Sequence, residues 1–264
     1  MSSSRDLFSL AGRIAVITGG SGKLGQQFAQ AMVAYGAQVI LLDLLQPPVR
    51  QNHVHYFKVD ITKRKQIEDA ATMICKKWTV PKILVNNAAL DSPPNAPASE
   101  NGPFESYPED SFDRIMNVNV KGTFLCCQVF GGLMAEAREG SIINICSTYG
   151  ILSPVQEIYE YKRRTGSRWY KPAPYSVSKS AILNLTRYLA TYWAKKNVRV
   201  NTLTPGGVFN NQDKEFLAEY CRRIPVGRMA DSNELNGAIV FLASDASSYM
   251  TGANLVVDGG WSAW

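Results

Sequence analysis

Residues 13–25 read Arg-Ile-Ala-Val-Ile-Thr-Gly-Gly-Ser-Gly-Lys-Leu-Gly, and this stretch decides the fold. Its first six residues form an apolar run rich in β-branched side chains, which is typical of a buried strand. Glycine-rich sequence follows at once, and a helical pattern then runs through Phe28 and Met32 to a stop at Gly36. The stretch therefore predicts a strand that turns sharply into a helix.

Strands and helices alternate along the rest of the chain. Short apolar runs predict further strands at residues 38–43, 54–59, 82–86, 141–146, 198–204 and 254–257. Periodic segments predict helices at residues 63–78, from 109 to about 138, and at 181–194, and residues 91–108 have the composition of a loop. Because the strands are apolar on both faces, we expect one α/β domain over residues 1–264, with a seven-stranded parallel sheet and helices on both faces.

The composition narrows the class of protein. Hydrophobic residues make up 45% of the chain and charged residues 19%, which suits a packed globular core. No run of about 18 apolar residues occurs, so we expect no membrane contact, and the N-terminus is too weakly apolar for a signal peptide. Five cysteines without a CxxC pair favour reduced thiols and a cytoplasmic location. His53 and His55 are too few for a metal site, and the charge of +6 comes without a motif for binding nucleic acid.

The glycines after the first strand suit a dinucleotide. Gly19, Gly22 and Gly25 allow a tight turn and the close approach of a pyrophosphate, and the helix that follows offers unpaired N–H groups. Asp43 ends the second strand about 20 residues further on, where a carboxylate binds the ribose hydroxyls of NAD and repels the 2′-phosphate of NADP. A cap or turn role for Asp43 is the plainer alternative. Lys23 could attract a 2′-phosphate, but no basic residue directly follows Asp43, so we expect NAD rather than NADP.

With these features the chain resembles the short-chain dehydrogenase/reductase family, and further family motifs follow in order. They are Asp60 after the third strand, Asn86-Asn87-Ala88-Ala89, Asn117-Val118-Asn119-Val120, Tyr175-x-x-x-Lys179, Thr204-Pro205-Gly206-Gly207-Val208 and Asp258-Gly259-Gly260. The resemblance implies a Rossmann-like domain, an oxidoreductase that acts on CH–OH groups, and a homodimer or homotetramer.

The resemblance also implies roles for individual residues. Tyr175 would be the catalytic acid/base, and Lys179, four residues later on the same helical face, would favour its ionised form. Ser147 would donate a hydrogen bond to the substrate oxygen, and Asn119 would hold a water that links Lys179 to solvent. The expected cofactor contacts are Gly19, Ser21, Gly22, Lys23, Leu24, Gly25, Asp43, Asp60, Ile61, Asn87, Ala88, Ala89, Tyr175, Lys179, Pro205, Gly206 and Val208.

Two features depart from the family pattern. Lys23 occupies the place of the middle glycine, so the glycine spacing is instead similar to that of longer members that modify sugar nucleotides. Asn210 stands near the position where a threonine often touches the cofactor. These departures bear on the geometry of the pyrophosphate and on one cofactor contact.

The segment between Ser147 and Tyr175 is roughly twice as long as is usual in the family. Residues 156–171 carry five cations, two acids and four aromatic side chains. Aromatic faces suit sugar rings and basic side chains suit phosphate, so we expect residues 154–172 to cover an anionic or sugar-like substrate. The expected basic contacts are Arg163, Arg164 and Arg168. A solvated loop or an oligomer contact is the alternative, and such an insert is also similar to dehydrogenases of flagellin glycosylation and nonulosonic-acid biosynthesis.

Three functions remain at this point. The leading one is NAD-dependent hydride transfer between nicotinamide and a secondary alcohol or carbonyl, on a sugar or sugar phosphate. The second is a generic carbonyl or 3-oxoacyl reductase, which a preference for NADPH would favour. The third is a nucleotide-binding sensor or scaffold without turnover, and the presence of all four catalytic residues argues against it.

Overall fold

The computed structural model describes residues 6–48, 52–91, 98–166 and 168–264. Seven parallel strands form one sheet in the order β3-β2-β1-β4-β5-β6-β7. The strands are β1 (Ile14–Thr18), β2 (Gln38–Asp43), β3 (Val54–Lys58), β4 (Ile83–Asn86), β5 (Gly140–Ile145), β6 (Val198–Pro205) and β7 (Asn254–Val257). The predicted seven-stranded parallel sheet is confirmed, with strand bounds that differ by at most one residue at each end.

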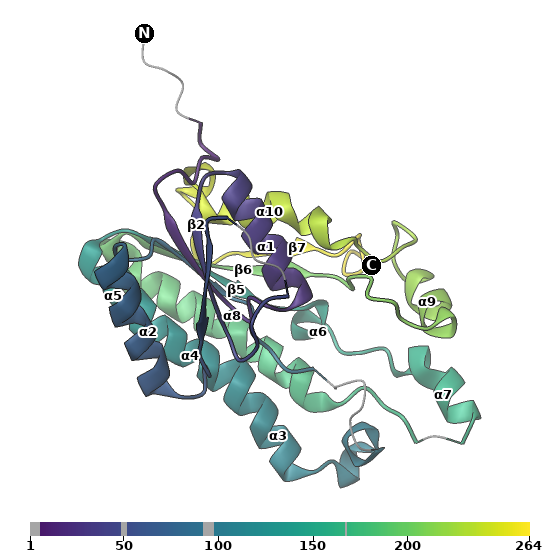
Figure 1. Cartoon of the computed structure of the whole chain (residues 1–264). Coiled ribbons are helices and arrows are strands. Elements are labelled where there is room, and N and C mark those ends of the chain that lie inside the picture. Colours follow the sequence, from purple (N-terminus) through teal and green to yellow (C-terminus); the bar gives the residue numbers. More distant parts are fainter. Residues whose placement is uncertain (1–5, 49–51, 92–97, 167) are drawn as a thin grey trace.

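Helices cover both faces of this sheet (Figure 1). One face carries α1 (Lys23–Ala34) and α10 (Asn236–Ala243), and the other carries α2 (Arg64–Lys77), α8 (Ala173–Trp193) and a long helix, Glu109–Ala137. The long helix consists of α3 (Glu109–Met116), α4 (Thr123–Cys126) and α5 (Gly132–Ala137), joined by π-helical turns at Asn117–Gly122 and Cys127–Gly131. The remaining α-helices of the described chain are α6 (Thr148–Ile151), α7 (Glu160–Arg164) and α9 (Lys214–Cys221).

Side chains that alternate along each strand produce two cores. In β1, Ile14 and Val16 belong to the core beneath α2 and α8, whereas Ala15 and Ile17 belong to the core beneath α1 and α10. All four of these side chains are buried. Burial on both sides explains why the strand sequences are apolar throughout rather than alternately polar.

The order of the strands creates a crevice at one edge of the sheet. The chain moves outward from β1 to β3 and then returns to place β4 on the other side of β1, where Thr18 is in register with Asn86. Ligands of such sheets bind outside the carboxyl ends of the strands at this switch point. The segments that follow β1, β2, β4, β5 and β6 therefore lie at the edge where a ligand is expected.

The helices differ more from their predicted positions than the strands do. Helix α8 begins at Ala173 rather than at residue 181, so Tyr175 and Lys179 both lie within it. Pro174 occupies the first turn, where its missing N–H breaks no helical hydrogen bond. The predicted loop at 91–108 contains short 3₁₀ turns at Ala98–Asn101 and Phe104–Ser106, and neither α9 nor α10 was predicted.

One helix among the described residues, Glu109–Ala137, is long and apolar enough by length and composition to cross a membrane. Half of its apolar window is buried within the protein. Leu125, Phe130 and Met134 of this helix pack in the core beneath α2 and α8. The helix is thus buried in part within the core of the protein.

Candidate active site

Glycines shape the turn that follows β1. Gly19 has a φ of 61°, and a Cβ there would lie 2.7 Å from the Cα of Ala88. A Cβ on Gly25 would lie 2.4 Å from the carbonyl oxygen of Gly19. At Gly22, the N-cap of α1, a Cβ would meet only that same oxygen, at 3.4 Å, and no side chain caps the helix. The first N–H groups of α1 are thus left open to an anion such as a pyrophosphate.

Asp43 lies beside this turn at the end of β2. Its Oδ2 accepts a hydrogen bond from the N–H of Ser21 at 2.9 Å, and its Oδ1 accepts one from the N–H of Leu45 at 3.1 Å. Both residues that follow it, Leu44 and Leu45, are apolar and exposed. Asp43 therefore places a carboxylate next to the open helix terminus, and no basic residue directly follows it in the sequence. This arrangement fits the ribose of NAD better than a 2′-phosphate.

Asp60 and Ile61 lie after β3 at the same edge of the sheet. One carboxylate oxygen of Asp60 accepts hydrogen bonds from the N–H and the hydroxyl of Thr62, at 2.9 and 2.7 Å. Ile61 is buried, and its Cδ1 would lie 2.6 Å from a Cβ added to Gly122. Asp60 thus stabilises its own turn, and its contact with the cofactor stays a prediction.

The segment after β4 is tied to the glycine-rich turn. The side-chain amide of Asn87 donates to the carbonyl oxygens of Thr18 and Gly19 at 3.1 and 3.0 Å. The backbone N–H groups of Asn87 and Ala88 both donate to the hydroxyl of Thr18 at 3.1 Å. These bonds hold β1 and β4 together where the crevice opens.

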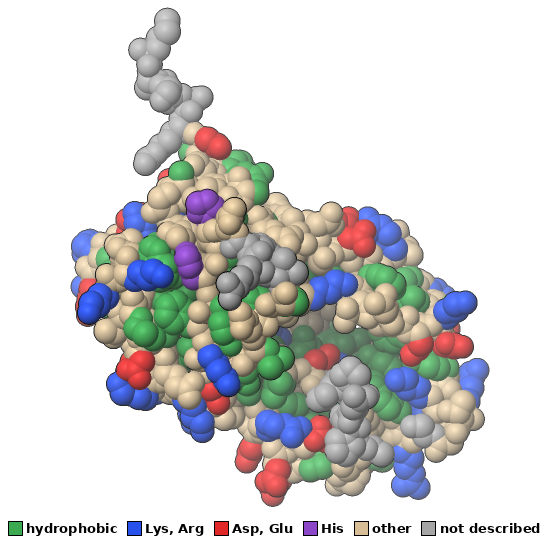
Figure 2. All heavy atoms as spheres, in the orientation of Figure 1, with side chains coloured by type: hydrophobic (Ala, Val, Ile, Leu, Met, Phe, Trp, Pro, Cys, Tyr) green, Lys and Arg blue, Asp and Glu red, His purple; other side chains and the backbone are tan. Residues whose placement is uncertain are grey.

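A cleft of about 360 Å³ opens at this edge. Figure 2 shows a hollow in this face of the molecule, with hydrophobic side chains inside it and charged side chains around its rim. The expected site residues that line the cleft are Leu24, Asn87, Ala89, Ser147, Tyr175, Lys179, Pro205, Gly206 and Val208. The structure therefore brings the loops after β1, β4, β5 and β6 to one cavity.

Ser147, Tyr175 and Lys179 meet in this cleft from two elements. Ser147 caps α6, and its hydroxyl oxygen accepts a hydrogen bond from the N–H of Tyr149 at 3.2 Å. The hydroxyl proton of Ser147 remains able to donate to another group. Lys179 lies one turn after Tyr175 on α8, and its Nζ donates to the carbonyl oxygen of Ile145 at 2.8 Å.

Burial controls the protonation of Tyr175 and Lys179. It raises the pKa of Tyr175 above that of an ordinary phenol, the charge of Asp91 raises it further, and a hydrogen bond to Ser147 lowers it. Tyr175 is therefore a protonated phenol at neutral pH, able to donate its proton. Burial also lowers the pKa of Lys179 to about 8.

Asn119 lies in the first π-helical turn and does not line the cleft among the described residues. Its side-chain amide donates to the carbonyl oxygen of Leu90 and to the hydroxyl of Ser178, each at 2.9 Å, and its Oδ1 accepts from the N–H of Leu90 at 2.7 Å. Its own carbonyl oxygen accepts a hydrogen bond from the hydroxyl of Thr123 at 2.8 Å. Asn119 thus positions Leu90 and α8, and the water relay expected of it stays a prediction.

The far wall of the cleft follows β6. A Cβ on Gly206 would lie 2.8 Å from the Cα of Asp258, so the chain passes close to the end of β7 here. Lys23 donates a hydrogen bond from Nζ to the carbonyl oxygen of Phe209 and so links the glycine-rich turn to this loop. Gln212 lines the cleft, whereas Asn210 is exposed outside it.

The three arginines expected to contact substrate do not line the cleft. Arg163 donates to the carbonyl oxygens of Gln156 and Trp169 at 2.9 and 3.1 Å, and it pairs with Glu160 at 2.7 Å. Its guanidinium therefore holds residues 154–172 together from within. The remaining two, Arg164 and Arg168, are exposed, so the structure places none of the three predicted arginines at the cleft.

Residues that were not predicted as site residues complete the cleft. Asp91 and Lys171 pair at 2.5 Å although they are 80 residues apart in the chain. Each adjoins a recognised motif, since Asp91 follows Ala89 and Lys171 precedes Tyr175, and this proximity is the signal that could have identified them. The other such residues include Tyr149, Tyr159, Gln212, Phe216, Tyr220 and Met229.

Comparison with known proteins identifies the family. The family model described as enoyl-(acyl carrier protein) reductase matches residues 21–262. An NAD-dependent glycerol dehydrogenase of Listeria innocua is 29% identical over 266 residues, and a gluconate 5-dehydrogenase of Gluconobacter oxydans is 32% identical over 270 residues; each alignment covers 97% of this chain and 96% of the relative. A short-chain dehydrogenase of Leptospira borgpetersenii, solved with bound NAD⁺, has a TM-score of 0.87 and 33% identity, over 99% of this chain and 97% of that one. The chain belongs to the short-chain dehydrogenase/reductase family.

Proposed function

We propose that the protein is an NAD-dependent oxidoreductase that interconverts a secondary alcohol and a ketone on a polyol or sugar. The observation that carries this proposal is that Ser147, Tyr175 and Lys179 line one cleft at the carboxyl edge of the sheet. Among relatives, the glycerol and gluconate dehydrogenases act on compounds with several hydroxyl groups, as their names state.

When bound, the nicotinamide supplies or accepts the hydride. In the reducing direction, Tyr175 donates its phenolic proton to the substrate oxygen as negative charge develops there. Ser147 donates a hydrogen bond to the same oxygen. In the oxidising direction, Tyr175 accepts the alcohol proton, and the nearby positive charge of Lys179 favours the tyrosinate that this step requires.

The residues of the glycine-rich turn support NAD as the cofactor. Gly22 leaves the N-terminus of α1 open, and Asp43 presents a carboxylate beside it. Two of the similar proteins are described with NAD, namely the Listeria dehydrogenase and the Leptospira structure. The Leptospira structure aligns with 99% of this chain, so we expect NAD to bind this chain at the same place.

Two alternatives make different predictions. A 3-oxoacyl or generic carbonyl reductase would prefer NADPH and an acyl thioester. The cleft of this chain contains the ion pair between Asp91 and Lys171, which an acyl chain would leave unused. A non-catalytic nucleotide sensor would bind cofactor without turnover. A relation to flagellin-glycosylation or nonulosonic-acid enzymes stays a prediction, since the relatives named above are of other kinds.

The test is a cofactor-linked absorbance screen with NAD⁺, NADP⁺ and their reduced forms, over polyols, sugars, sugar acids, simple ketones and an acetoacetyl thioester. Reduction of NAD⁺ by a polyol or sugar supports the proposal. Turnover confined to NADPH and acyl thioesters would establish the reductase alternative. Cofactor binding without turnover of any compound would establish the sensor.

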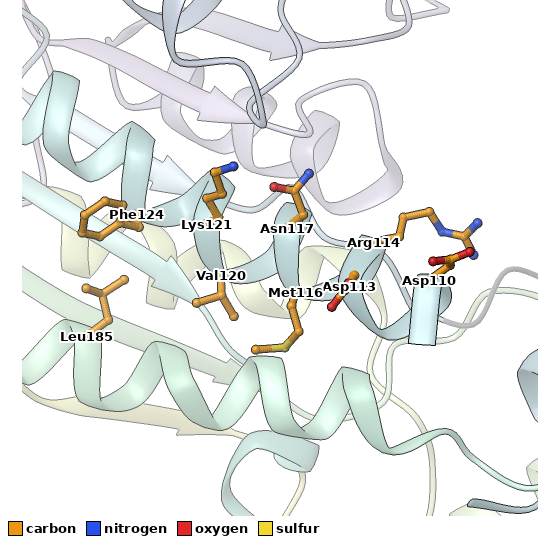
Figure 3. Close-up of a pocket in the computed structure, with 9 residues that line it drawn as sticks. All are labelled: Asp110, Asp113, Arg114, Met116, Asn117, Val120, Lys121, Phe124 and Leu185. Carbon is orange, nitrogen blue, oxygen red and sulfur yellow. The ribbon is translucent and has the colours of Figure 1, made fainter. Parts of the chain in front are cut away.

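We propose further that the protein forms a homodimer or homotetramer through the long helix and α8. A shallow groove of about 880 Å³ runs between them, and in Figure 3 Phe124 of α4 lies opposite Leu185 of α8, with Met116 and Val120 further along the groove. The side chains of Tyr188 and Tyr192 on α8 are 62% and 65% exposed. Exposed apolar patches of this kind mark protein contacts.

A second copy of the chain is the partner that the charges of this groove favour. Asp110 and Asp113 lie at one end of it together with Arg114, whose charge is paired with Glu100 at 2.7 Å, and Lys121 lies further along the same helix (Figure 3). Two copies packed with these helices antiparallel would bring the acidic end of one groove toward the basic part of the other. We also propose a cytoplasmic location, which five free cysteines in the described structure support.

A further inference from the structure

The ion pair between Asp91 and Lys171 has no part in the hydride transfer described above. Nζ of Lys171 lies 2.5 Å from Oδ1 of Asp91, and both residues line the cleft. The same Nζ is 5.1 Å from the centre of the Tyr175 ring and 6.0 Å from that of Tyr149. The side chain of Lys171 is only 9% exposed, against 47% for Asp91. The charged pair therefore lies close enough to the Tyr175 phenol that a substrate bound there could contact both.

Both ends of the pair are held in place by other side chains. The side-chain amide of Gln156 donates to the carbonyl oxygen of Lys171 and accepts from its N–H, each at 3.0 Å. Leu90, the residue before Asp91, is held in the same two-point manner by the amide of Asn119. Two buried or half-buried amides thus fix the backbone on either side of the cleft where the pair forms.

Such a pair contributes little to folding. An exposed ion pair adds little to stability, and partial burial adds a desolvation cost that the attraction only partly offsets. Lys171 is almost fully buried beside the catalytic Tyr175, and its backbone is held by Gln156. Because the pair contributes little to folding, we expect Lys171 to act in binding. The position points to a substrate contact.

Apart from Lys179, the other described residues that line the cleft are neutral. Burial raises the pKa of Tyr149 and of Tyr159, so both are neutral phenols. The hydroxyl of Tyr149 is buried and has no hydrogen-bond partner at good geometry among the described residues, although the phenol of Tyr159 is close enough to influence its pKa. Arg223, which also influences Tyr149, is paired with Glu219 at 3.0 Å.

The charges that face the cleft leave little to attract an anion. Among the residues that the structure describes, its ionised lining residues are Asp91, Lys171 and Lys179. Lys171 is compensated by Asp91, and Lys179 is buried with its Nζ on the carbonyl oxygen of Ile145. A carboxylate or phosphate that approached Lys171 would also have to approach Asp91, and like charges at close range repel.

We propose that the Asp91–Lys171 pair is the substrate-selecting element of the cleft, and that it selects neutral polyols and ketoses over sugar acids and sugar phosphates. This inference rests on the proposed function. A hydroxyl group both donates and accepts, so it donates to the Asp91 carboxylate while it accepts from the Lys171 ammonium. Adjacent hydroxyls of one polyol satisfy both members of the pair at once. An anionic group accepts only from Lys171 and leaves Asp91 facing a like charge.

The test uses matched substrates that differ only at one end of the carbon chain. D-Arabinitol is compared with D-arabinonate, and D-glucitol with D-gluconate, with NAD⁺ and the full-length protein. We expect kcat/KM of the wild type to favour each polyol over its acid by at least tenfold. Equal or better use of the acids would overturn the proposal, and this wild-type ratio stands without any variant.

Two variants locate the effect in the pair. Asp91→Asn keeps the shape of the side chain and leaves the charge of Lys171 uncompensated, so the preference should shift at least tenfold toward the acids. Lys171→Gln should raise KM for polyols at least tenfold while leaving the Kd for NADH, measured by fluorescence titration, unchanged. Arg164→Gln removes one positive charge from the same segment at an exposed position and should change neither ratio. A shift below twofold in Asp91→Asn, with its fold intact by circular dichroism, would contradict the proposal.

Failure of the proposed function gives a different result. If no alcohol or ketone is turned over although NADH binds, the oxidoreductase proposal fails. Calorimetry of the same substrate pairs on the NADH complex then decides the selectivity by itself. Tighter binding of the polyols supports the proposal, and tighter binding of the acids, or of neither, overturns it.

Discussion

Nζ of Lys179 lies 5.8 Å from the centre of the Tyr175 ring, one helical turn away, and it bonds to the carbonyl oxygen of Ile145 rather than to the phenol. The lysine therefore acts on Tyr175 through its charge. Burial lowers the pKa of Lys179 to about 8, and burial of the phenol separately raises the pKa of Tyr175. Burial thus disfavours the charged forms of both Tyr175 and Lys179. The next predictions, on Tyr175→Phe and Lys179→Met, follow from this.

Tyr175→Phe should abolish turnover and leave cofactor binding nearly unchanged. The substitution removes the proton that the substrate oxygen needs but keeps the ring beside Lys179. Loss of a positioned acid costs about 10²–10⁴-fold in rate. Steady-state rates beside an NADH fluorescence titration separate the two effects, and turnover near that of the wild type would exclude Tyr175 as the acid.

Lys179→Met should stabilise the protein at pH 7. A pKa lowered from its ordinary value of 10.5 to about 8 corresponds to a destabilisation of about 3 kcal/mol, at about 1.4 kcal/mol per unit. Loss of the hydrogen bond to Ile145 offsets about 1 kcal/mol of the gain, so we expect a net increase of about 2 kcal/mol in the free energy of unfolding. Urea unfolding measures the change in the free energy of unfolding. Lys195→Met, at an exposed position, is the control and should change this free energy little.

The same substitution has a defined pH dependence. Between pH 8 and about 10.4 the unfolded chain binds the lysine proton more fully than the folded protein, so the wild type gains stability from this group as the pH rises. The methionine variant lacks that gain. The difference between the two proteins should therefore be largest below pH 8 and shrink toward pH 10, and a difference that grows with pH would contradict burial as the cause.

Asp43→Ala combined with Leu44→Arg should shift cofactor preference toward NADP. The first change removes a carboxylate that repels a 2′-phosphate, and the second adds a guanidinium at an exposed position beside it. We expect the ratio of the Kd values for NADPH and NADH to change by at least tenfold. Asp43→Asn is the matched control, because it removes the charge but supplies no phosphate partner. Preference of the wild type for NADP would sink this assignment.

The sheet could be predicted from sequence because parallel strands are buried on both sides. Each strand then appears as an unbroken apolar run, as β1 does from Ile14 to Thr18, and no tertiary information is needed. The alignment of Tyr175 with Lys179 was predictable for a similar reason, since a spacing of four within a helix fixes one face. The start of α8 was not, because Pro174 within its first turn looks like a helix breaker.

Side chains on loops were the part that sequence could not place. The partners Asp91 and Lys171 are 80 residues apart, and nothing local links them. The composition of residues 154–172 indicated a basic surface. It did not show that Arg163 would donate its hydrogen bonds to the backbone of Gln156 and Trp169 within the same segment. Which charges face the cleft depends on tertiary packing.

Arg163→Ala should loosen residues 154–172 without removing a substrate contact. It leaves the carbonyl oxygens of Gln156 and Trp169 without their partner, at a cost of about 1–3 kcal/mol in local stability. Chymotryptic cleavage within the segment should accelerate roughly tenfold, and KM should rise because Lys171 is less well placed. Arg164→Ala, at an exposed neighbouring position, should cleave at the wild-type rate. Equal effects of the two substitutions would argue against internal bracing by Arg163.

Phe124→Glu should weaken self-association. Phe124 lies on the groove between the long helix and α8 and is 43% exposed, so a carboxylate there is tolerated in a single copy but is desolvated when a second copy covers it. Sedimentation velocity of the wild type should show a dimer or tetramer, and the variant should dissociate at micromolar concentration with its fold intact by circular dichroism. Phe104→Glu is the control, because Phe104 is 78% exposed but lies outside this groove. A wild type that sediments as a monomer, or a control that dissociates as readily as Phe124→Glu, would show that this face is not the interface.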